Sequence, residues 1–318
     1  MKPGFSVIVP LYNKGAHIDR TLSSLLGQGF TDFEAIIVDD GSSDDGPARV
    51  AACTDPRITL VRQANQGASA ARNAGVAMAQ GAYAAFLDAD DEWSPDFLET
   101  LAALIEEAPG AALYATAYRE IGPQGEVARV SAKGLPPGSL DGSRLDYLAC
   151  VAADRYPFYT SSCCVEVVAF RRAGGFDTAL AIGEDIDLWL RLAFDAGVRF
   201  DPRACASYRR DAGNRAMEHP LRAERLLAFV ERLDRLRREY GSDPAREALL
   251  ARLLAANLVR SVTSFARRGD IAMADTLMAR FHSDLSPKEH KRLSRKLLKH
   301  RLIGFFRGER HAQGDSSS

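Results

Sequence analysis

Short apolar runs alternate with helix-compatible stretches over the first hundred residues of this chain. The apolar runs are Phe5–Val9, Phe33–Val38, Ile58–Val61 and Tyr83–Leu87. The helix-compatible stretches are Ile18–Leu26, Asp45–Ala52 and Ser69–Ala79. Apolar runs of this length are typical of strands buried on both faces of a parallel sheet. The alternation therefore predicts an α/β fold with a doubly wound, mostly parallel sheet whose ligands bind beyond the carboxyl ends of the strands.

The second half of the chain has a different pattern. A further strand is expected at Ala111–Thr116, and the five Gly and three Pro of residues 120–143 favour a loop or hairpin insertion. From about Pro220 onward the periodicity is helical almost throughout. The breaks between its four segments are expected near Gly241, Gly269 and Ser286. We therefore predict an α/β domain over residues 1–215 and an all-helical extension over residues 216–318.

The composition excludes several classes of protein. With 46% hydrophobic and 26% charged residues, the 318-residue chain has the apolar content of an ordinary folded protein. Its formal net charge of -1 argues against a nucleic-acid binder. The five cysteines form no CxxC pair and no complete set of disulfides, which indicates a reducing cytoplasm. We expect neither a signal peptide nor a membrane-spanning helix, because the first apolar run is short and eighteen consecutive apolar residues never occur.

Positive charge is concentrated near the carboxyl terminus. Residues 286–311 carry nine Lys or Arg and two Glu, which gives this segment a net charge of +7. Apolar residues recur among them at near-helical spacing, namely Leu293, Leu297, Leu298, Leu302, Ile303, Phe305 and Phe306. Two interpretations are open: an amphipathic helix in a membrane interface, or a solvated helix that packs its leucine face on the protein.

Polar residues directly follow three of the predicted strands. They are Pro10-Leu11-Tyr12-Asn13-Lys14, Asp39-Asp40-Gly41-Ser42-Ser43-Asp44 and Asp88-Ala89-Asp90-Asp91. Each cluster alone fits an ordinary turn or strand end. Together at one edge of a sheet they indicate a ligand site, because neighbouring carboxylates repel one another unless a cation or a donor-rich ligand compensates them.

Asp88 and Asp90 give the clearest chemical signal. Residues i and i+2 at the end of a strand point to the same side, so both carboxylates can reach one hard cation or one hydroxyl-rich ligand. A divalent ion that keeps waters and binds phosphate oxygens, Mg²⁺ or Mn²⁺, suits so sparse a ligand set. The competing interpretation is a solvated acidic loop before a helix that starts near Ser94-Pro95.

Six motifs follow one another in a fixed order. Four of them are Ser6–Asn13, Ile37–Asp44, Asn65–Gly67 with Ala71–Gly75, and Phe86–Asp91. The other two are Gly174–Asp177 and Gly183–Arg191. Their order and spacing resemble those of family 2 glycosyltransferases, which have the GT-A fold. The resemblance covers about Phe5–Tyr208, and implies a nucleotide-binding half over residues 1–110 and an acceptor half over residues 111–215.

The resemblance assigns roles to residues of the nucleotide-binding half. Tyr12 would stack on the nucleotide base, and Asp40 would accept a hydrogen bond from the ring NH of uracil or thymine. Arg72 would face the diphosphate, where a guanidinium fork is useful, and the alternative is an ordinary surface arginine of a helix. The predicted nucleotide- and cofactor-binding set is completed by Pro10, Asn13 and Ala89.

The resemblance also implies a metal site at the second acidic cluster. Asp88 and Asp90 would hold an Mn²⁺ or Mg²⁺ ion that neutralises charge on the leaving nucleoside diphosphate. Whether Asp91 also binds the ion stays open at this point.

In the acceptor half, the resemblance implies that Asp185 is the general base. It would deprotonate the acceptor hydroxyl as this attacks the anomeric carbon, so that transfer proceeds by single displacement with inversion. The alternative is a carboxylate stabilised by the dipole of a helix over residues 185–195, a role that Glu184 and Asp187 share. Trp189 is expected in the core or in the wall of an acceptor pocket.

Two further features of this half bear on the site. Where many relatives carry a histidine, this chain has Asp211, which puts in doubt an additional metal or diphosphate contact from that loop. Arg209 or Arg210 could still reach phosphate. The vicinal pair Cys163-Cys164 is interpreted as small core-filling residues.

The sequence thus predicts a cytoplasmic, metal-dependent, inverting glycosyltransferase. It would move a sugar from a UDP-linked donor to a hydroxyl of a bacterial surface glycan or lipid-linked acceptor, with residues 286–311 as a candidate peripheral membrane contact. A sugar nucleotidyltransferase is one alternative, but it would need a Gly-rich, basic phosphate loop where Pro10–Asn13 stands. A catalytically degenerate nucleotide-sugar sensor or scaffold is the other.

Overall fold

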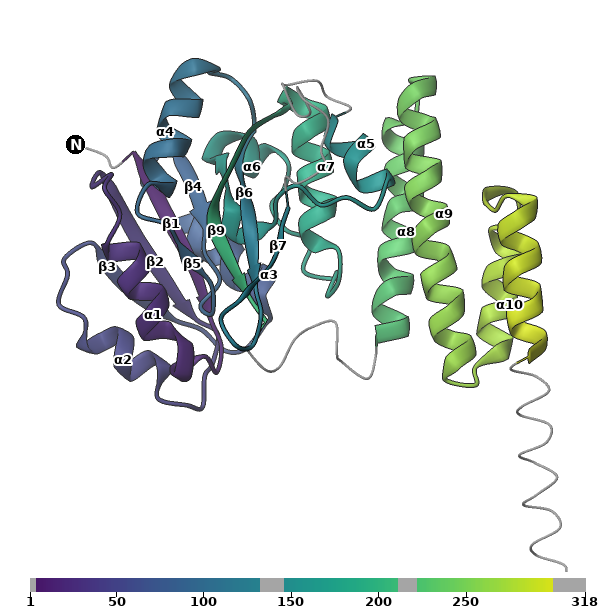
Figure 1. The fold of residues 1–318 in the computed structure, drawn as a ribbon, viewed down its shortest axis with the longest axis horizontal. Helices are drawn as coiled ribbons and strands as arrows, with labels where there is room; N and C mark the ends of the chain where they lie inside the picture. Colours follow the sequence, from purple (N-terminus) through teal and green to yellow (C-terminus); the bar gives the residue numbers. More distant parts are fainter. Residues whose placement is uncertain (1–3, 132–145, 211–221, 300–318) are drawn as a thin grey trace, which may run out of the picture. The chain divides into compact units, whose positions relative to one another are not determined.

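A computed structural model of the protein describes residues 4–131, 146–210 and 222–299. The chain divides into two compact units, residues 1–215 and 216–318 (Figure 1). The first unit is a sheet flanked by helices, and the second is built from helices.

The first four strands along the chain form the parallel half of the sheet. They are β1 (Phe5–Leu11), β2 (Phe33–Asp39), β3 (Ile58–Arg62) and β4 (Tyr83–Phe86). They lie in the order β3-β2-β1-β4, and each is parallel to its neighbours in this set. Their carboxyl ends therefore share one edge of the sheet. The predicted α/β class and the four predicted strands are confirmed.

Four further strands extend this sheet beyond β4. They are β5 (Glu92–Trp93), β6 (Leu113–Ile121), β8 (Cys163–Glu166) and β9 (Val198–Arg209). Strand β8 is antiparallel to both β4 and β6, β9 is parallel to β6, and β5 is antiparallel to β9. The short β7 (Val127–Val130) forms a hairpin with β6. The rest of the predicted insertion, residues 132–143, lies outside the described residues.

The helices between the strands position the loops at the strand ends. In the first half they are α1 (Gly15–Leu26), α2 (Gly46–Ala52), α3 (Ala68–Met78) and α4 (Phe97–Glu107). Helix α3 lies unusually close to β1, because a Cβ atom on Gly75 would meet Cγ2 of Ile8 at 2.4 Å. Glycine at this position thus brings α3, which carries Arg72, directly onto the sheet.

The described part of the acceptor half contributes three helices and a short 3-10 turn. They are α5 (Asp146–Ala152), η1 (Thr160–Ser162), α6 (Val167–Arg172) and α7 (Glu184–Ala196). Trp189 of α7 is fully buried, and its ring lies 5.9 Å from that of Phe86 and 5.6 Å from that of Phe176 between centroids. Of the two interpretations of Trp189, the structure therefore favours the core. Cys163 and Cys164 are also fully buried, as core-filling residues would be.

The helical unit contains α8 (Arg222–Tyr240), α9 (Pro244–Arg267), α10 (Ile271–Arg280), the 3-10 turn η3 (His282–Asp284) and a helix over residues 287–299. Side chains that accept hydrogen bonds from the first turn cap two of the helices, Asp243 from Arg246 N and Asp270 from Met273 N. Among the described residues, α9 alone is long and apolar enough to cross a membrane by length and composition. Half of its apolar stretch is buried, and α9 contacts α8 and α10, so packing within the unit accounts for its leucines.

The basic helix over residues 287–299 packs two of its three leucines inward. Leu293 is 1% and Leu297 3% exposed, whereas Leu298 is 55% exposed. For the described part of the segment, the structure therefore favours the interpretation of a leucine face packed on the protein. The remaining apolar residues of the predicted amphipathic helix lie beyond residue 299, outside the described residues.

Candidate functional site

The three polar clusters of the sequence meet at the carboxyl edge of the parallel strands. The loop after β1 and the loop after β2 are joined by hydrogen bonds: Asn13 N donates to Ser42 Oγ at 3.1 Å, and Ser43 N donates to Asn13 Oδ1 at 2.8 Å. Gly15 N donates to Asp44 Oδ2 at 2.7 Å. Asn13 has a φ of 51°, a left-handed conformation that asparagine tolerates better than most residues. These contacts give the edge a fixed shape.

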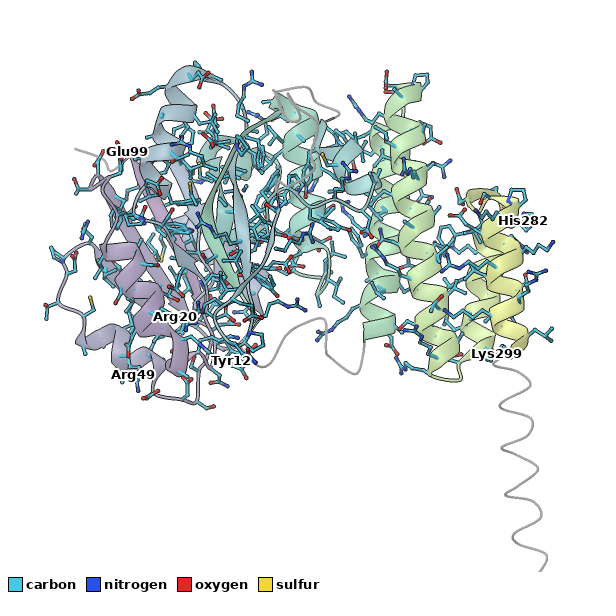
Figure 2. The ribbon with its side chains drawn as sticks, in the orientation of Figure 1. Tyr12, Arg20, Arg49, Glu99, His282 and Lys299 are labelled. Atoms are coloured by element: carbon cyan, nitrogen blue, oxygen red, sulfur yellow. The ribbon has the colours of Figure 1, made fainter. Side chains whose placement is uncertain are left out.

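Tyr12 is the exposed aromatic residue of this edge. Its side chain is 40% exposed, and Figure 2 shows it at the end of the first unit opposite to Glu99 of α4. A partly exposed ring beside a rigid polar loop can serve as a stacking platform for a planar ligand. Pro10, two residues earlier, is half-buried at the end of β1.

Asp40 organises the loop that leads into α3. It is 2% exposed, and its carboxylate accepts hydrogen bonds from Gln66 N at 2.9 Å, Gly67 N at 2.8 Å and Gln63 Nε2 at 2.8 Å. A carboxylate offers about four acceptor positions, so a fourth donor still fits on Oδ2. The assigned role of Asp40 toward a nucleotide base remains a prediction, and the structure adds a role in holding the start of α3.

Asp88 and Asp90 each meet a cation of the protein. Arg72 Nη2 lies 2.6 Å from Asp88 Oδ1, and Lys14 Nζ lies 2.8 Å from Asp90 Oδ2. The Asp88 side chain is 28% exposed and that of Asp90 21%, so both remain accessible from the solvent. Ala89 between them is buried. Both predicted metal ligands are thus partly exposed and paired with a cation of the protein, and their role as metal ligands remains a prediction.

Arg72 is a buried residue, not a surface arginine. It is 5% exposed, its Nη1 lies 3.7 Å from Glu184 Oε1, and its guanidinium lies 5.4 Å from the centroid of the Phe176 ring. Burial acts to lower the pKa of Arg72, but the charge of Asp88 and that of Glu184 raise it above its ordinary value, so the group stays charged. Nε and Nη1 find no hydrogen-bond acceptor in the structure. Buried N–H donors rarely lack an acceptor, and an anionic ligand would supply acceptors to these two groups.

Asp91, unlike Asp88 and Asp90, is buried in the protein. It is 1% exposed, accepts a hydrogen bond from Ser161 Oγ at 2.7 Å and another from Arg209 N at 3.2 Å. Ser161 Oγ in turn accepts the backbone N–H of Asp88 at 3.0 Å. Burial, together with the charge of Asp90, raises the pKa of Asp91 well above its ordinary value. Asp91 therefore anchors the acidic loop to η1 and β9, whereas Asp88 and Asp90 remain partly exposed.

The first turn of α7 places two carboxylates beside Arg72. Gly183, with a φ of 79°, allows the chain to enter the helix, and Glu184 and Asp185 follow directly. Burial raises the pKa of Asp185 above its ordinary value. Burial and the charge of Asp185 raise the pKa of Glu184 to about 7, against the opposing effect of Arg72. A carboxylate with a raised pKa is a stronger base once it is ionised.

Asp187, two residues further on, has a structural role. Its carboxylate is fully buried and is held by Arg191, with Nη2 at 2.7 Å and Nε at 3.0 Å from Oδ2. The same guanidinium donates to the backbone oxygens of Ala173 and Gly175. This arrangement fixes α7 to the glycine-rich turn before it. Asp211 lies outside the described residues.

The donor set at the acidic loop fits a divalent ion that takes the rest of its ligands from water or phosphate. Oxygen ligands suit Mg²⁺ and Mn²⁺, and the side chains of Asp88 and Asp90 are partly exposed. Among residues 4–131, 146–210 and 222–299, no group of three or more His, Cys, Asp or Glu side chains forms a complete metal site. Sequence reasoning assigned no role to Lys14, one residue beyond the first motif, or to Ser161, which lies outside the six motifs, because nothing in their local sequence reveals which distant carboxylate they contact.

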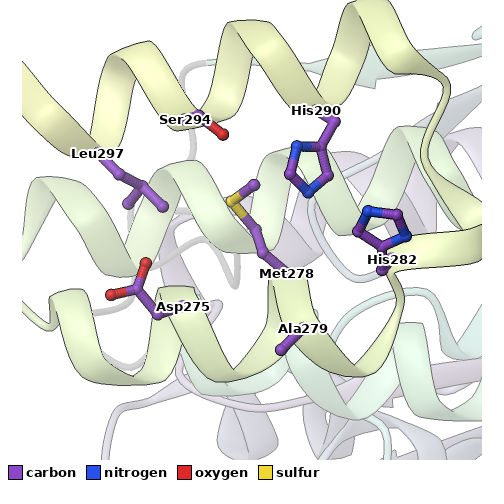
Figure 3. A pocket seen from close by; sticks show the side chains of 7 residues that line it. All are labelled: Asp275, Met278, Ala279, His282, His290, Ser294 and Leu297. Atoms are coloured by element: carbon purple, nitrogen blue, oxygen red, sulfur yellow. The ribbon is translucent and has the colours of Figure 1, made fainter.

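A separate hollow belongs to the helical unit. It has a volume of about 290 Å³ and contains none of the predicted site residues. Figure 3 shows that the rings of His282 and His290 face one another at its rim, with their centroids 4.8 Å apart. The residues that line it are Asp275, Met278, Ala279, His282, His290, Ser294 and Leu297.

The doubly wound sheet, the aspartates and buried arginine at its strand ends, and the helix that starts with two carboxylates together form the arrangement that the resemblance to GT-A glycosyltransferases implies. The family model described as glycosyl transferase family 2 matches residues 6–176. The chain belongs to this family.

Two curated relatives support the assignment. The succinoglycan biosynthesis protein ExoO of Rhizobium meliloti is 30% identical over 262 residues, which cover 76% of this chain and 70% of that protein. The uncharacterized glycosyltransferase YibD of Escherichia coli is 48% identical over 98 residues, which cover 30% of this chain and 28% of that protein. The match with YibD thus spans less than a third of either chain.

Solved structures share the fold. The structure of Staphylococcus aureus TarS 1–349 in complex with UDP-GlcNAc has a TM-score of 0.65 and 19% identity, with 99% of this chain and 92% of that chain covered. The mannosyltransferase PcManGT of Pyrobaculum calidifontis, in complex with GDP-Man and Mn²⁺, has a TM-score of 0.60 and 19% identity, with 95% and 87% covered. The predicted GT-A fold is confirmed.

Proposed function

We propose that this protein transfers a sugar from a UDP-linked donor to a hydroxyl group of a bacterial surface glycan or lipid-linked acceptor, with a divalent ion and with inversion. The observation that carries the proposal is the buried Arg72, whose Nε and Nη1 lack acceptors beside two accessible carboxylates. A diphosphate bound through a metal ion on Asp88 and Asp90 would supply those acceptors. Donor complexes of structural neighbours, UDP-GlcNAc on TarS and GDP-Man with Mn²⁺ on PcManGT, support a nucleotide-sugar donor.

The residues of the edge would divide the work of donor binding. Tyr12 would stack on the base, with Pro10 and Asn13 shaping the loop beneath it, and Asp40 would use its remaining acceptor position for the ring NH. Arg72 would bind the diphosphate. When bound, the metal ion would stabilise the charge that develops on the leaving diphosphate.

Asp185 would act as the general base. The acceptor oxygen forms a bond to the anomeric carbon while the bond from that carbon to the diphosphate oxygen breaks, and the hydroxyl proton passes to Asp185. Attack opposite the leaving group inverts the configuration. The raised pKa of Asp185, caused by burial, suits a carboxylate that has to accept a proton.

The proposed acceptor class rests on the name of a relative, and the proposed location rests on the basic helix of the second unit. ExoO is named for succinoglycan biosynthesis, which favours a polysaccharide or its lipid-linked precursor as acceptor. Such precursors are membrane-bound, and the basic helix over residues 287–299 would hold the cytoplasmic enzyme at the inner face of the membrane. Because Leu293 and Leu297 are packed inward, this contact would depend on charge in the described part of the helix.

Transfer to a crude extract tests the proposal without knowledge of the acceptor. Radiolabelled UDP-sugars are supplied with Mn²⁺ and a bacterial membrane-lipid or glycan extract, and incorporation of label is measured. Asp185→Asn should lower turnover by about 100-fold to 10,000-fold with little effect on donor affinity. Asp195→Asn, an exposed carboxylate at the other end of α7, is the matched control. If Asp185→Asn incorporates as much label as the wild type, Asp185 is not the general base. If the wild type itself neither hydrolyses nor transfers the donor sugar, the result favours a catalytically degenerate sensor.

A further inference from the structure

Lys14 is the cation of the site to which the motifs assign no role. It stands after Tyr12 and Asn13 in the loop that follows β1 and directly precedes α1, and its Nζ lies 2.8 Å from Oδ2 of Asp90. Its side chain is 17% exposed, so the pair is largely sheltered from water. The contact joins residues 76 positions apart, and it arises because β1 and β4 are parallel neighbours whose following loops meet at the same edge.

The two cations of the edge differ in what they can do. Arg72 is buried on a helix packed against the sheet and its guanidinium is a rigid fork. Lys14 carries a compact charge on a flexible four-carbon stem, so its ammonium can move by several ångströms without a change in the backbone. Asp90, its partner, is one of the two carboxylates that the proposed function gives to the metal ion.

A divalent ion on Asp90 would compete with Lys14 for the same oxygen. Like charges that share one carboxylate repel each other strongly in a partly buried site. The nearest new anion would be the diphosphate that the ion itself brings, and an ammonium group is a common phosphate ligand that acts as a point charge. The geometry therefore provides both a reason for Lys14 to leave Asp90 and a place for it to go.

We propose that Lys14 is a donor-phosphate ligand that Asp90 holds in position, and that it exchanges Asp90 for the diphosphate when the metal ion binds. This inference rests on the proposed function, because it requires a metal-bound diphosphate at the acidic loop. It predicts opposite effects of one substitution on two ligands. Removal of the Lys14 charge should favour the metal ion alone and disfavour the nucleotide.

Titration calorimetry with Mn²⁺ alone, and with UDP at saturating Mn²⁺, tests the exchange. Lys14→Gln should bind Mn²⁺ about tenfold more tightly than the wild type, because a competing charge is gone, and should bind UDP about tenfold more weakly. Lys14→Arg keeps the charge and should restore most of the UDP affinity. Arg57→Gln is the matched control, since Arg57 forms a similarly exposed pair with Asp55 before β3, at the opposite edge of the sheet.

The outcomes separate this inference from the proposed function. If the wild type binds UDP in a Mn²⁺-dependent way but Lys14→Gln and Lys14→Arg bind both ligands as the wild type does, Lys14 has no such role and the proposed function stands. Weaker Mn²⁺ binding by a folded Lys14→Gln would also overturn the exchange. If the wild type shows no Mn²⁺-dependent UDP binding, the proposed function fails and the role of Lys14 with it.

Discussion

At the scale of single residues, the site is a balance of charges that few local signals reveal. Arg72 lies among Asp88, Glu184 and Asp185, and its charge is what allows three carboxylates to stand so close together. Removing the positive charge of Arg72, or the negative charges of all three carboxylates, would leave the opposite charge buried without compensation. Residues of this kind shape the pH dependence of the protein as well as its chemistry.

Glu184 should make the stability fall as the pH rises toward neutrality. Its pKa is about 7 in the folded protein, against an ordinary value of 4.5, because burial and the charge of Asp185 disfavour its ionised form. The destabilising effect is absent below pH 4.5, grows between pH 4.5 and 7, and is complete above pH 7. The free energy of unfolding of Glu184→Gln, relative to that of the wild type, should therefore rise by about 1 to 3 kcal/mol from pH 5 to pH 8. Urea denaturation of the variant and of the wild type at the lower and the upper pH measures this rise. The same difference in the free energy of unfolding between the two proteins at both pH values would contradict it.

Sequence reasoning identified the residues that stand at strand ends but not their long-range partners. Tyr12, Asp88 and Asp90 could be found because each follows an apolar run, and parallel strands place such positions at one edge. The contact of Lys14 with Asp90 and that of Ser161 with Asp91 join residues 76 and 70 positions apart. Their side chains could have pointed elsewhere in the same fold, so only the packed structure fixes these pairs.

At the scale of elements, the acidic loop after β4 is held from three sides. Thr21 Oγ1 of α1 lies 3.0 Å from the carbonyl oxygen of Ala89, Ser161 of η1 bridges Asp88 and Asp91, and β9 donates its Arg209 N–H to Asp91. A loop fixed in this way holds its two partly exposed carboxylates in place. Preorganised ligands of this kind lose little freedom when they bind an ion.

Asp91→Ala should separate anchoring from metal binding. The substitution leaves the Ser161 hydroxyl and the Arg209 N–H without their buried acceptor, so we expect a loss of about 1 to 3 kcal/mol in the free energy of unfolding. Asp90→Ala, at a partly exposed position, should cost far less. Chemical denaturation of both variants checks this. A stability of Asp91→Ala equal to that of the wild type would show that Asp91 is not an anchor.

Helix boundaries show where local patterns mislead. Periodicity predicted a helix from Ile18, whereas α1 begins at Gly15, because the first turn is fixed by the Asp44 carboxylate and not by its own apolar residues. Helix α7 was expected at residues 185–195 and spans Glu184–Ala196, since Gly183 marks its start clearly. The strands and helices were thus predictable, while the contacts that align their ends were not.

At the scale of the whole molecule, the helical unit carries the basic segment over residues 286–311, whose net charge is +7. Lys291, Arg295 and Lys299 are exposed on the helix over residues 287–299, while Leu293 and Leu297 pack inward. Replacing these three residues by Gln should leave the unit folded. Each basic residue near an anionic surface contributes about 1 kcal/mol, so the variant should lose most of its binding to anionic vesicles at low salt. Vesicle sedimentation measures this, with uncharged lipid as the control. Unchanged sedimentation of the variant would refute a membrane contact through this helix.

The central claim is that the strand-end carboxylates bind a nucleoside diphosphate through a divalent ion. The most direct test is calorimetric titration of UDP into the wild type with Mn²⁺, into the wild type with EDTA, and into Asp90→Ala with Mn²⁺. We expect binding in the first case and at least about tenfold weaker binding in the other two, because without the ion the carboxylates repel the diphosphate. Equal affinity in all three titrations would contradict it.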